Sequence, residues 1–216
     1  MILRPHGPTR VAITQPDHAA LAGRIMNAWR ANDLPSSKRR DEILVAVAEH
    51  DNGWREIDAQ FLVDPATGAV LDFMTVSGDI KRGVWPRAIE RLSATPYAAA
   101  LVAHHAVHVY SRFRSDPEWA GFFPEMEAIR DRLARRDELL SDYLFLRIGD
   151  LASLTFCTAA NMHVGEFGYM VRLDENELTI TPDPFDGAEV PLQISGRDLR
   201  DPEQIVTITA VARGSQ

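Results

Sequence analysis

Histidine and aspartate residues recur along this chain in an order that would suit a metal site. His18 comes first, the adjacent pair His50-Asp51 follows, three histidines stand at positions 104, 105 and 108, and Asp150 comes last. Imidazole and carboxylate ligands without thiolates suit divalent zinc, manganese, iron, cobalt or nickel. The sequence therefore predicts a divalent transition metal held by histidine and aspartate side chains.

The His50-Asp51 pair stands where an apolar run with helical periodicity, residues 43–48, gives way to a polar stretch. Adjacent imidazole and carboxylate groups can both reach one ion if the backbone turns there. Gly53 is expected to supply the turn, because glycine adopts positive φ without steric cost. For the pair taken alone, the alternative is a helix C-terminus at which the helix dipole favours a histidine.

Apolar periodicity places these residues on separate helices or at their ends. The expected helices span residues 16–29, 38–50, 86–93, 96–113, 125–141 and 142–154. Positions three and four apart share a helix face, so His105 lies with His108, while His104 and His108 form the competing pair. Asp150 is an acid within an apolar run, so it needs a cationic partner, either Arg147 or a metal ion.

The long segment 54–75 follows the His50-Asp51 pair and contains two aromatic residues, Trp54 and Phe73. A loop of this length in a compact domain is usually functional or ordered by packing. One interpretation is that it roofs a pocket over the His50-Asp51 corner with these aromatics as anchors. The interpretation that we favour slightly is that both rings simply fill the core.

After residue 162 the pattern changes to the alternation typical of β-strands. Residues 167–173 and 178–181 flank a polar turn, residues 190–194 and 205–211 supply two further strands, and residues 11–14 are a short strand or an extended lead-in. We therefore expect a mainly α fold, a helical bundle with a small C-terminal antiparallel β-sheet. The helical domain is predicted over residues 1–162, with a β-rich appendage over residues 163–216 packed on the same domain.

The composition favours a soluble, cytoplasmic protein that acts on a small molecule. A net charge of −8 argues against nucleic-acid binding, which needs a basic surface. No stretch approaches the ~18 apolar residues of a membrane span, and the N-terminus lacks the apolar segment of a signal peptide. The only cysteine, Cys157, excludes an internal disulfide and a cysteine-based zinc site. A homodimer is left open.

The order of the histidines and aspartates resembles the HD-domain superfamily of metal-dependent phosphohydrolases. Its signature is a His, a later His-Asp doublet and a distant Asp, on separate helices of an all-α core; His18, His50-Asp51 and Asp150 match it. The stretches 15–18, 50–54 and 72–73 also resemble an uncharacterised bacterial family of HD-like proteins, over most of the chain. Because members with two metals add histidines from intervening helices, the resemblance implies one or two divalent ions on His18, His50, Asp51, His105, His108 and Asp150, with His104 as a substitute.

One position departs from the pattern of many hydrolytic members, in which the doublet continues as His-Asp-x-Gly-Lys. Gly53 is kept here, but Trp54 stands in place of the lysine, which removes a cation expected to face the phosphate. The candidates to replace that cation are Arg55, Lys81, Arg82 and Arg147.

The resemblance implies a metal-dependent phosphohydrolase that cleaves a small, phosphorylated substrate through a metal-bound water. Asp51 would bind the metal and orient the attacking water, and Arg147 would help to stabilise the developing charge. Two other functions stay open: an HD-type di-iron oxygenase, and a non-catalytic module that binds a metal, a ligand or a partner. Structural roles are also open, with His18 as a helix cap, His105 as a hydrogen-bonded core residue and Asp150 as the partner of Arg147.

Overall fold

The structure is a computed structural model that describes residues 1–31, 34–35, 38–160 and 168–216. The predicted domain boundary between residues 162 and 163 lies outside these ranges. The strands are β1 (Ile2–His6), β2 (Thr9–Ile13), β3 (Met170–Asp174), β4 (Glu177–Thr181), β5 (Val190–Asp198) and β6 (Ile205–Gly214). The α-helices are α1 (Gln15–Asn27), α2 (Lys38–Glu49), α3 (Arg55–Asp58), α4 (Gly78–Arg91), α5 (Pro96–Val109), α6 (Phe122–Leu133) and α7 (Arg136–Thr158). Short 3₁₀ helices are η1 (Asn52–Trp54), η2 (Ser111–Phe113) and η3 (Pro117–Trp119).

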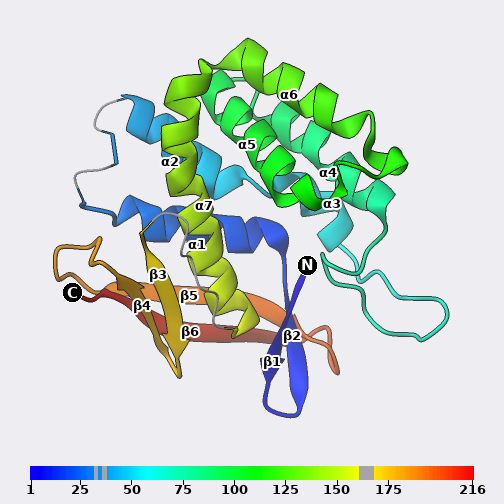
Figure 1. Ribbon diagram of the computed structural model, residues 1–216. Helices are drawn as coiled ribbons and strands as arrows, with labels where there is room; N and C mark the ends of the chain where they lie inside the picture. Colours follow the sequence, from blue (N-terminus) through cyan, green and yellow to red (C-terminus); the bar gives the residue numbers. More distant parts are fainter. Residues whose placement is uncertain (32–33, 36–37, 161–167) are drawn as a thin grey trace.

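The described strands form one six-stranded sheet in the order β1-β2-β5-β6-β4-β3 (Figure 1). Neighbouring strands are antiparallel except β4 and β6, which run parallel. The N-terminal hairpin joins the C-terminal strands where Ala12 of β2 lies opposite Arg197 of β5. This approach requires Gly196, because a Cβ atom there would lie 2.6 Å from the carbonyl oxygen of Ala12.

This sheet corrects the expected fold class. The prediction of a mainly α bundle with a small C-terminal antiparallel sheet is wrong, because the chain is 49% helical and 20% strand and the sheet is mixed. The sheet also takes strands from both ends of the chain. The C-terminal strands and the strand alternative for residues 11–14 are confirmed. β1 was not predicted because its apolar–polar alternation is hidden: Arg4 is buried, and its guanidinium donates to the carbonyl of Phe156 in α7.

Two helices lie between the sheet and the remaining helices. α1 packs on β5 and α7 packs on β1 and β3, while α4, α5 and α6 lie on the side away from the sheet (Figure 1). This is the layered arrangement expected when a sheet buries one face under amphipathic helices. No helix in the described ranges combines the length and apolar character needed to cross a membrane.

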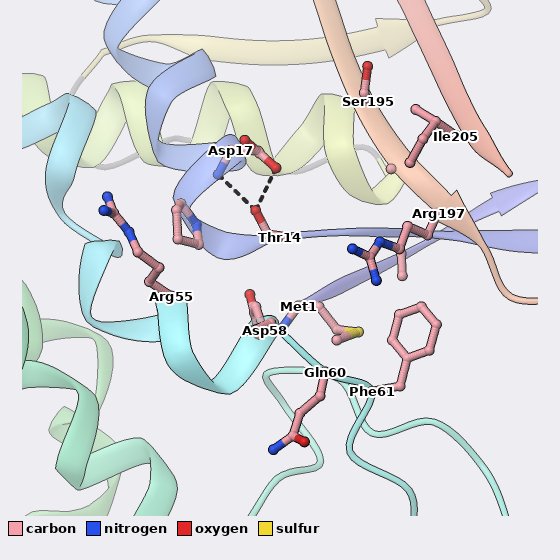
Figure 2. A pocket seen from close by; sticks show the side chains of 14 residues that line it. Met1, Thr14, Asp17, Arg55, Asp58, Gln60, Phe61, Ser195, Arg197 and Ile205 are labelled. Atoms are coloured by element: carbon pink, nitrogen blue, oxygen red, sulfur yellow. Dashed lines mark hydrogen bonds and ion pairs between the residues drawn. The ribbon is translucent and has the colours of Figure 1, made fainter. Parts of the chain in front are cut away.

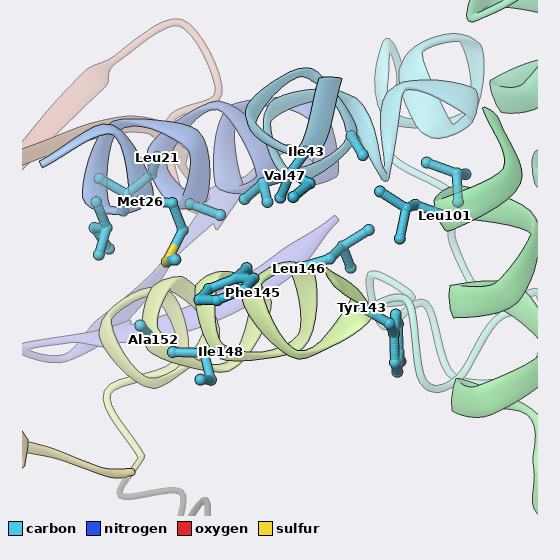
Figure 3. Packing of buried hydrophobic residues seen from close by; sticks show 14 of the residues in the cluster. Leu21, Met26, Ile43, Val47, Leu101, Tyr143, Phe145, Leu146, Ile148 and Ala152 are labelled. Atoms are coloured by element: carbon cyan, nitrogen blue, oxygen red, sulfur yellow. The ribbon is translucent and has the colours of Figure 1, made fainter. Parts of the chain in front are cut away.

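The buried core between α1, α2 and α7 is apolar and closely packed. In Figure 3, Leu21 and Met26 of α1 and Val47 of α2 face Phe145 of α7 across this layer. Glycine allows the close approach, since a Cβ at Gly149 would lie 2.8 Å from the Met26 Cγ and 2.9 Å from a Val47 methyl carbon. These three helices therefore approach closely, and the predicted ligands His18, His50-Asp51 and Asp150 lie on them or directly after them.

Candidate metal centre

Five of the predicted ligands converge in the interior. His18 lies in the first turn of α1, His50 and Asp51 directly follow α2, His105 lies in α5 and Asp150 in α7. Each is at most 7% exposed. Donor atoms of His18, His50 and Asp51 lie within 4.8 Å of one another, and so do those of His50, His105 and Asp150. Elements far apart in sequence thus bring imidazoles and carboxylates to one point.

The His50 ring is oriented by the last turn of α2. Its Nδ1 lies 2.8 Å from the carbonyl oxygen of Val47, and because a carbonyl only accepts, Nδ1 must carry the proton. The other nitrogen, Nε2, is buried and makes no hydrogen bond. It lies 3.6 Å from Asp51 Oδ2 and 3.5 Å from Asp150 Oδ1.

His18 is oriented in the same way by α7. The Ser153 hydroxyl donates to the carbonyl of Asp150 at 3.1 Å, so the same hydroxyl accepts from His18 Nδ1–H at 2.6 Å. This leaves His18 Nε2 facing carboxylates, 3.2 Å from Asp150 Oδ1 and 3.9 Å from Asp51 Oδ2. The structure gives His18 this role rather than that of a helix cap, which Thr14 supplies through its hydroxyl.

His105 approaches the same acids from α5. Its Nδ1 lies 3.0 Å from the hydroxyl of Tyr143, and its Nε2 lies 3.8 Å from Asp150 Oδ2. Burial lowers the pKa of His105 well below its ordinary value, although the Asp150 carboxylate opposes this. A neutral ring is the form that binds a metal.

The arrangement of His50 suits a proton or a cation between its ring and the acids. A neutral imidazole with the proton on Nδ1 turns its Nε2 lone pair toward Asp51 and Asp150, and a proton on the ring or on an acid, or a metal ion, removes the repulsion. Burial opposes protonation of His50, but the carboxylates of Asp51 and Asp150 outweigh it and raise its pKa to about 9. A metal ligand whose other ring nitrogen donates to a backbone carbonyl is the usual arrangement of metal-binding histidines. The residues therefore fit a divalent ion.

The two acids differ in their environments. Burial would raise the pKa of Asp150, but the hydrogen bond with His18 and the nearby His50 and His105 imidazoles hold it well below its ordinary value. Burial raises the pKa of Asp51 above its ordinary value, against the pull of the same two histidines. Arg147 Nη1 donates to Asp150 Oδ2 at 3.0 Å, so Oδ1 is the oxygen that faces His18 and His50.

The loop after Asp51 is held by α4 rather than by an unusual backbone angle. The expectation of positive φ at Gly53 is wrong, since the described glycines with positive φ are Gly7, Gly68, Gly168 and Gly187. Gly53 is required for close approach, because a Cβ there would lie 1.9 Å from the carbonyl oxygen of Val84. Two arginines of α4 also donate to this loop, Arg87 to the carbonyl of Gly53 and Arg91 to that of Asn52.

A cavity of about 310 Å³ opens directly onto the cluster. Its lining includes His18, Asp51, His105 and Asp150, together with the aromatic residues Trp54, Phe73, Trp85 and Tyr110. Both interpretations of these aromatics hold in part, because Trp54 and Phe73 line this cavity while Trp54 belongs to the buried core and Phe73 packs against it. Three buried polar atoms of the lining, Arg147 Nε, Trp85 Nε1 and the side-chain oxygen of Gln15, have no hydrogen-bond partner among the described residues.

Three cations line this cavity. Of the four proposed to replace the missing lysine, Lys81 and Arg147 lie there, and Arg112 joins them. Arg82 instead pairs with Asp79 outside the cavity. Arg55 lines a different cavity.

The three neighbouring histidines of α5 contact Tyr143 in different ways. Tyr143 hydrogen-bonds His105, whereas the rings of His104 and His108 pack around it with centroids 4.5 and 5.3 Å away. Neither His104 nor His108 belongs to a donor group found within the described ranges. Helical spacing predicts which of the three histidines share a face of α5. It does not predict which face of α5 packs against the other helices, so it could not single out His105.

The groups that orient the rings were not identified from the sequence; they are the Val47 carbonyl, Ser153 and Tyr143. For Ser153 a usable signal exists, since it lies three residues after Asp150 and so shares its helix face. The Val47 carbonyl has no side-chain signature.

A second, larger cavity of about 560 Å³ lies on the other side of the start of α1 (Figure 2). Its lining contains no histidine, and its acids are engaged. Asp17 accepts from the Thr14 hydroxyl and backbone Asp17 N–H donates to that hydroxyl (Figure 2). Asp58 accepts from the Met1 ammonium at 2.6 Å and from backbone Gln15 N–H at 2.7 Å. The candidate metal ligands therefore line the smaller cavity.

Comparison with known proteins places the chain in a family without assigning it an activity. No curated protein and no solved structure matches it. The family described as "Protein of unknown function (DUF3891)" matches residues 1–201, nearly the whole length. The chain therefore belongs to the DUF3891 family.

Proposed function

We propose that this protein is a cytoplasmic metal-dependent phosphohydrolase that cleaves a small phosphoester. The observation that carries the proposal is the His50 ring, whose Nδ1–H is fixed by a carbonyl while its buried Nε2 faces two carboxylates without a hydrogen bond. His18, Asp51 and Asp150 complete a donor set of two imidazoles and two carboxylates, which suits a divalent transition metal. The resemblance to the HD-domain superfamily points to the same four residues.

In this proposal His18, His50, Asp51 and Asp150 hold the ion. When bound, a divalent cation polarises a phosphoryl oxygen and lowers the pKa of water. The second donor group shares His50 and adds His105, so the proposal admits one or two ions.

The chain's own residues bind and orient the phosphoester. Arg147 Nε and the Gln15 carboxamide offer buried polar atoms without partners in the cavity lining of the described structure. A guanidinium suits phosphoryl oxygens, and Asp51 lines the cavity where it would orient the attacking water. Hydrolysis forms a bond from the water oxygen to phosphorus and breaks the ester P–O bond. One proton of the water neutralises the leaving alkoxide, and the other stays on the inorganic phosphate.

Many HD-domain hydrolases have a lysine at the position of Trp54, and other cations in this cavity can supply the positive charge that is missing there. Lys81, Arg112 and Arg147 all belong to its lining. These three cations favour a negatively charged substrate, because cations gathered in a low-dielectric cleft raise the local concentration of an anionic ligand.

Metal content tests the proposal first. Protein purified without a chelator and without a metal-binding tag is expected to hold about one or two equivalents of manganese, cobalt, nickel or zinc. Asp51→Ala should lose the metal while keeping its helical circular dichroism. Asp41→Ala, which removes an exposed acid from α2, is the matched control and should keep the metal. The loaded protein should then release inorganic phosphate from at least one member of a small phosphoester panel.

Three outcomes contradict the proposal in different ways. Iron together with metal-dependent oxygen consumption would favour the di-iron oxygenase. Metal lost in Asp51→Ala without phosphate release from any panel member would favour a binding module. No metal in either protein, even after ions are added back, would remove the metal centre altogether.

A further inference from the structure

Two cations face the cavity without a neutralising acid. Lys81 of α4 donates through Nζ to the carbonyl of Met74 at 2.6 Å, and the Arg112 guanidinium of η2 lies 4.7 Å from the centroid of the Phe113 ring. Within the described ranges neither side chain forms an ion pair. Asp72 acts on Lys81 electrostatically, but its Oδ1 accepts from backbone Met74 N–H and other groups of its own loop.

Neighbouring cations in the same part of the chain are paired. Arg82, next to Lys81, pairs with Asp79, and Arg114, two residues after Arg112, pairs with Glu127 at 2.7 Å. The chain carries an excess of acids, with 31 Asp and Glu against 23 Lys and Arg, so acidic partners are plentiful. Burial and the proximity of Arg112 both lower the pKa of Lys81, which shows that the two cations repel each other. A bound anion would relieve that repulsion.

These cations differ from Arg147 in their contacts. Arg147 bonds the candidate ligand Asp150 directly, whereas in the described structure Lys81 and Arg112 bond none of the candidate ligands. The Tyr110 phenol of the same lining is influenced from both sides: burial raises its pKa, the Asp51 carboxylate raises it further and the Arg112 guanidinium opposes this. The cavity also has an aromatic wall, formed by Tyr110 with Trp54, Phe73 and Trp85.

We propose that the substrate is a small phosphoester with a second anionic group, which Lys81 and Arg112 bind while the phosphoryl group lies beside Arg147 at the metal centre. This inference rests on the proposed function and names its substrate class. A cavity of about 310 Å³ is at the low end of ligand pockets, so one small molecule fills it. The part of the substrate that joins the two anionic groups packs against the aromatic wall.

Binding of two matched phosphonates tests the inference without turnover. The compounds are 4-carboxybenzylphosphonate and 4-carbamoylbenzylphosphonate, which have nearly the same size and differ in the charge of the distal group. Metal-loaded wild type should bind the carboxylate at least ~10-fold more tightly, as expected for charge-assisted hydrogen bonds. Lys81→Met and Arg112→Met should each remove most of this preference. Arg82→Met and Arg114→Met change the net charge equally at neighbouring positions and should retain it.

A third compound distinguishes the source of the second charge. The bisphosphonate of para-xylene presents a phosphonate in place of the carboxylate, and tighter binding than the carboxylate would identify a second phosphate as the natural group. With the corresponding phosphate esters, Lys81→Met should raise KM for the charged ester by ~10-fold or more. Its KM for the amide ester, which lacks the second charge, should rise much less.

The two proposals fail in different ways. Equal binding of the carboxylate and the amide by wild type overturns the second anionic group, whether or not the esters are hydrolysed. A preference that survives both Lys81→Met and Arg112→Met overturns the assigned residues. A preference that these variants remove, without hydrolysis of any ester, supports the anion site and overturns the hydrolase.

Discussion

The carboxylate of Asp150 divides its two oxygens between two kinds of partner. Oδ1 faces Nε2 of His18 and of His50, whereas Oδ2 accepts from Arg147. Leaving a buried carboxylate unpaired would cost several kcal/mol. The sequence offered Arg147 and a metal ion as alternative partners for this acid, but the geometry makes them compatible, one at each oxygen.

Ser153 tests how far ring orientation controls metal binding. Ser153→Ala removes the oxygen that accepts from His18 Nδ1–H, so Nε2 loses its fixed direction toward the carboxylates. We expect metal affinity to fall about 10- to 100-fold with the fold retained. Thr158→Ala removes a hydroxyl–carbonyl bond of the same type in α7 away from the cluster and is the control. Competition with a chelating dye measures both, and equal affinity in Ser153→Ala and wild type would contradict the role given to Ser153.

Protons and metal should compete at His50. Its pKa of about 9 in the metal-free protein means that an ion entering near neutral pH displaces a proton. Apparent affinity should therefore rise with pH, by up to about tenfold per unit between roughly pH 6.5 and 9, and then level off. Calorimetric titrations in buffers of different ionisation enthalpy should count about one proton released near pH 7.5.

The metal-free protein should show the opposite pH trend in stability. Because the folded-state pKa of His50 is raised above its unfolded value, its stabilising contribution is complete below about pH 6.5 and is lost as pH rises through about 9. A metal affinity that stays constant between about pH 6.5 and 9 would contradict protonation of His50 in the metal-free protein.

The sequence predicted the ligand types but not the groups that orient them. His18, the His50-Asp51 pair and Asp150 stand out by residue type and order, the resemblance to the HD-domain superfamily implies these and His105 as ligands, and the structure brings all five together. His108 was grouped with His105 because helical spacing puts both on one side, yet its ring packs against Tyr143 outside the donor groups of the described residues. The bond from His50 to the Val47 carbonyl could not be read from side-chain identities, because every residue offers a carbonyl.

At the scale of elements, small residues decide how closely the ligand-bearing helices approach. A Cβ at Gly23 of α1 would lie 2.6 Å from the Cβ of Ala48 in α2, and Gly149 gives α7 similar contact with both helices. The distance between helix axes falls when the residues at the contact are small. These contacts bring together α1, α2 and α7, which carry or directly precede His18, His50, Asp51 and Asp150.

Gly53 links α4 to the metal centre and gives an element-scale prediction. Gly53→Ala puts a Cβ against the Val84 carbonyl, so the loop that follows Asp51 must move away from α4. We expect a loss of about 1–3 kcal/mol in unfolding free energy and a weaker metal affinity. Gly83→Ala is the control, since Gly83 lies within α4 and a Cβ there would meet nothing closer than 3.9 Å.

Urea unfolding and metal titration of the two glycine variants separate local strain from helix propensity. Gly83→Ala should be neutral or stabilising by up to about 1 kcal/mol, because alanine favours helix over glycine. Similar stability and similar metal affinity in both variants would show that the Gly53 contact does not position the ligands.

The fold was predictable only where local pattern determines structure. Alternation predicted the C-terminal strands, and periodicity predicted most helices. The placement of β2 beside β5 joins Ala12 to Arg197, a pairing that no local window contains. The buried Arg4 in β1 concealed the remaining edge of the sheet. Sheet order depends on such distant contacts, so the fold class was misjudged although most of its elements were not.

At the scale of the whole molecule, the metal centre joins segments that fold together. α1 follows β2 after a single residue, Thr14, so His18 is tied to the N-terminal hairpin and through it to β5. His50 and Asp51 are held by α4, and Asp150 lies on α7, which packs on β1 and β3. An ion that needs all of these ligands binds the folded chain and has no equivalent site in the unfolded one.

Metal should therefore stabilise the entire fold rather than one helix. At a free concentration about 100 times Kd, binding adds roughly 2.7 kcal/mol, which corresponds to a rise in Tm of about 5–10 °C for a chain of this size. Chelator-treated protein should show one cooperative transition that moves up on adding back the ion found in the purified protein. Asp51→Ala should lose the shift, and Asp41→Ala should keep it. A shift confined to a minor early transition would mean that the ion stabilises only a local segment, and an equal shift in Asp51→Ala would place the bound metal elsewhere on the chain.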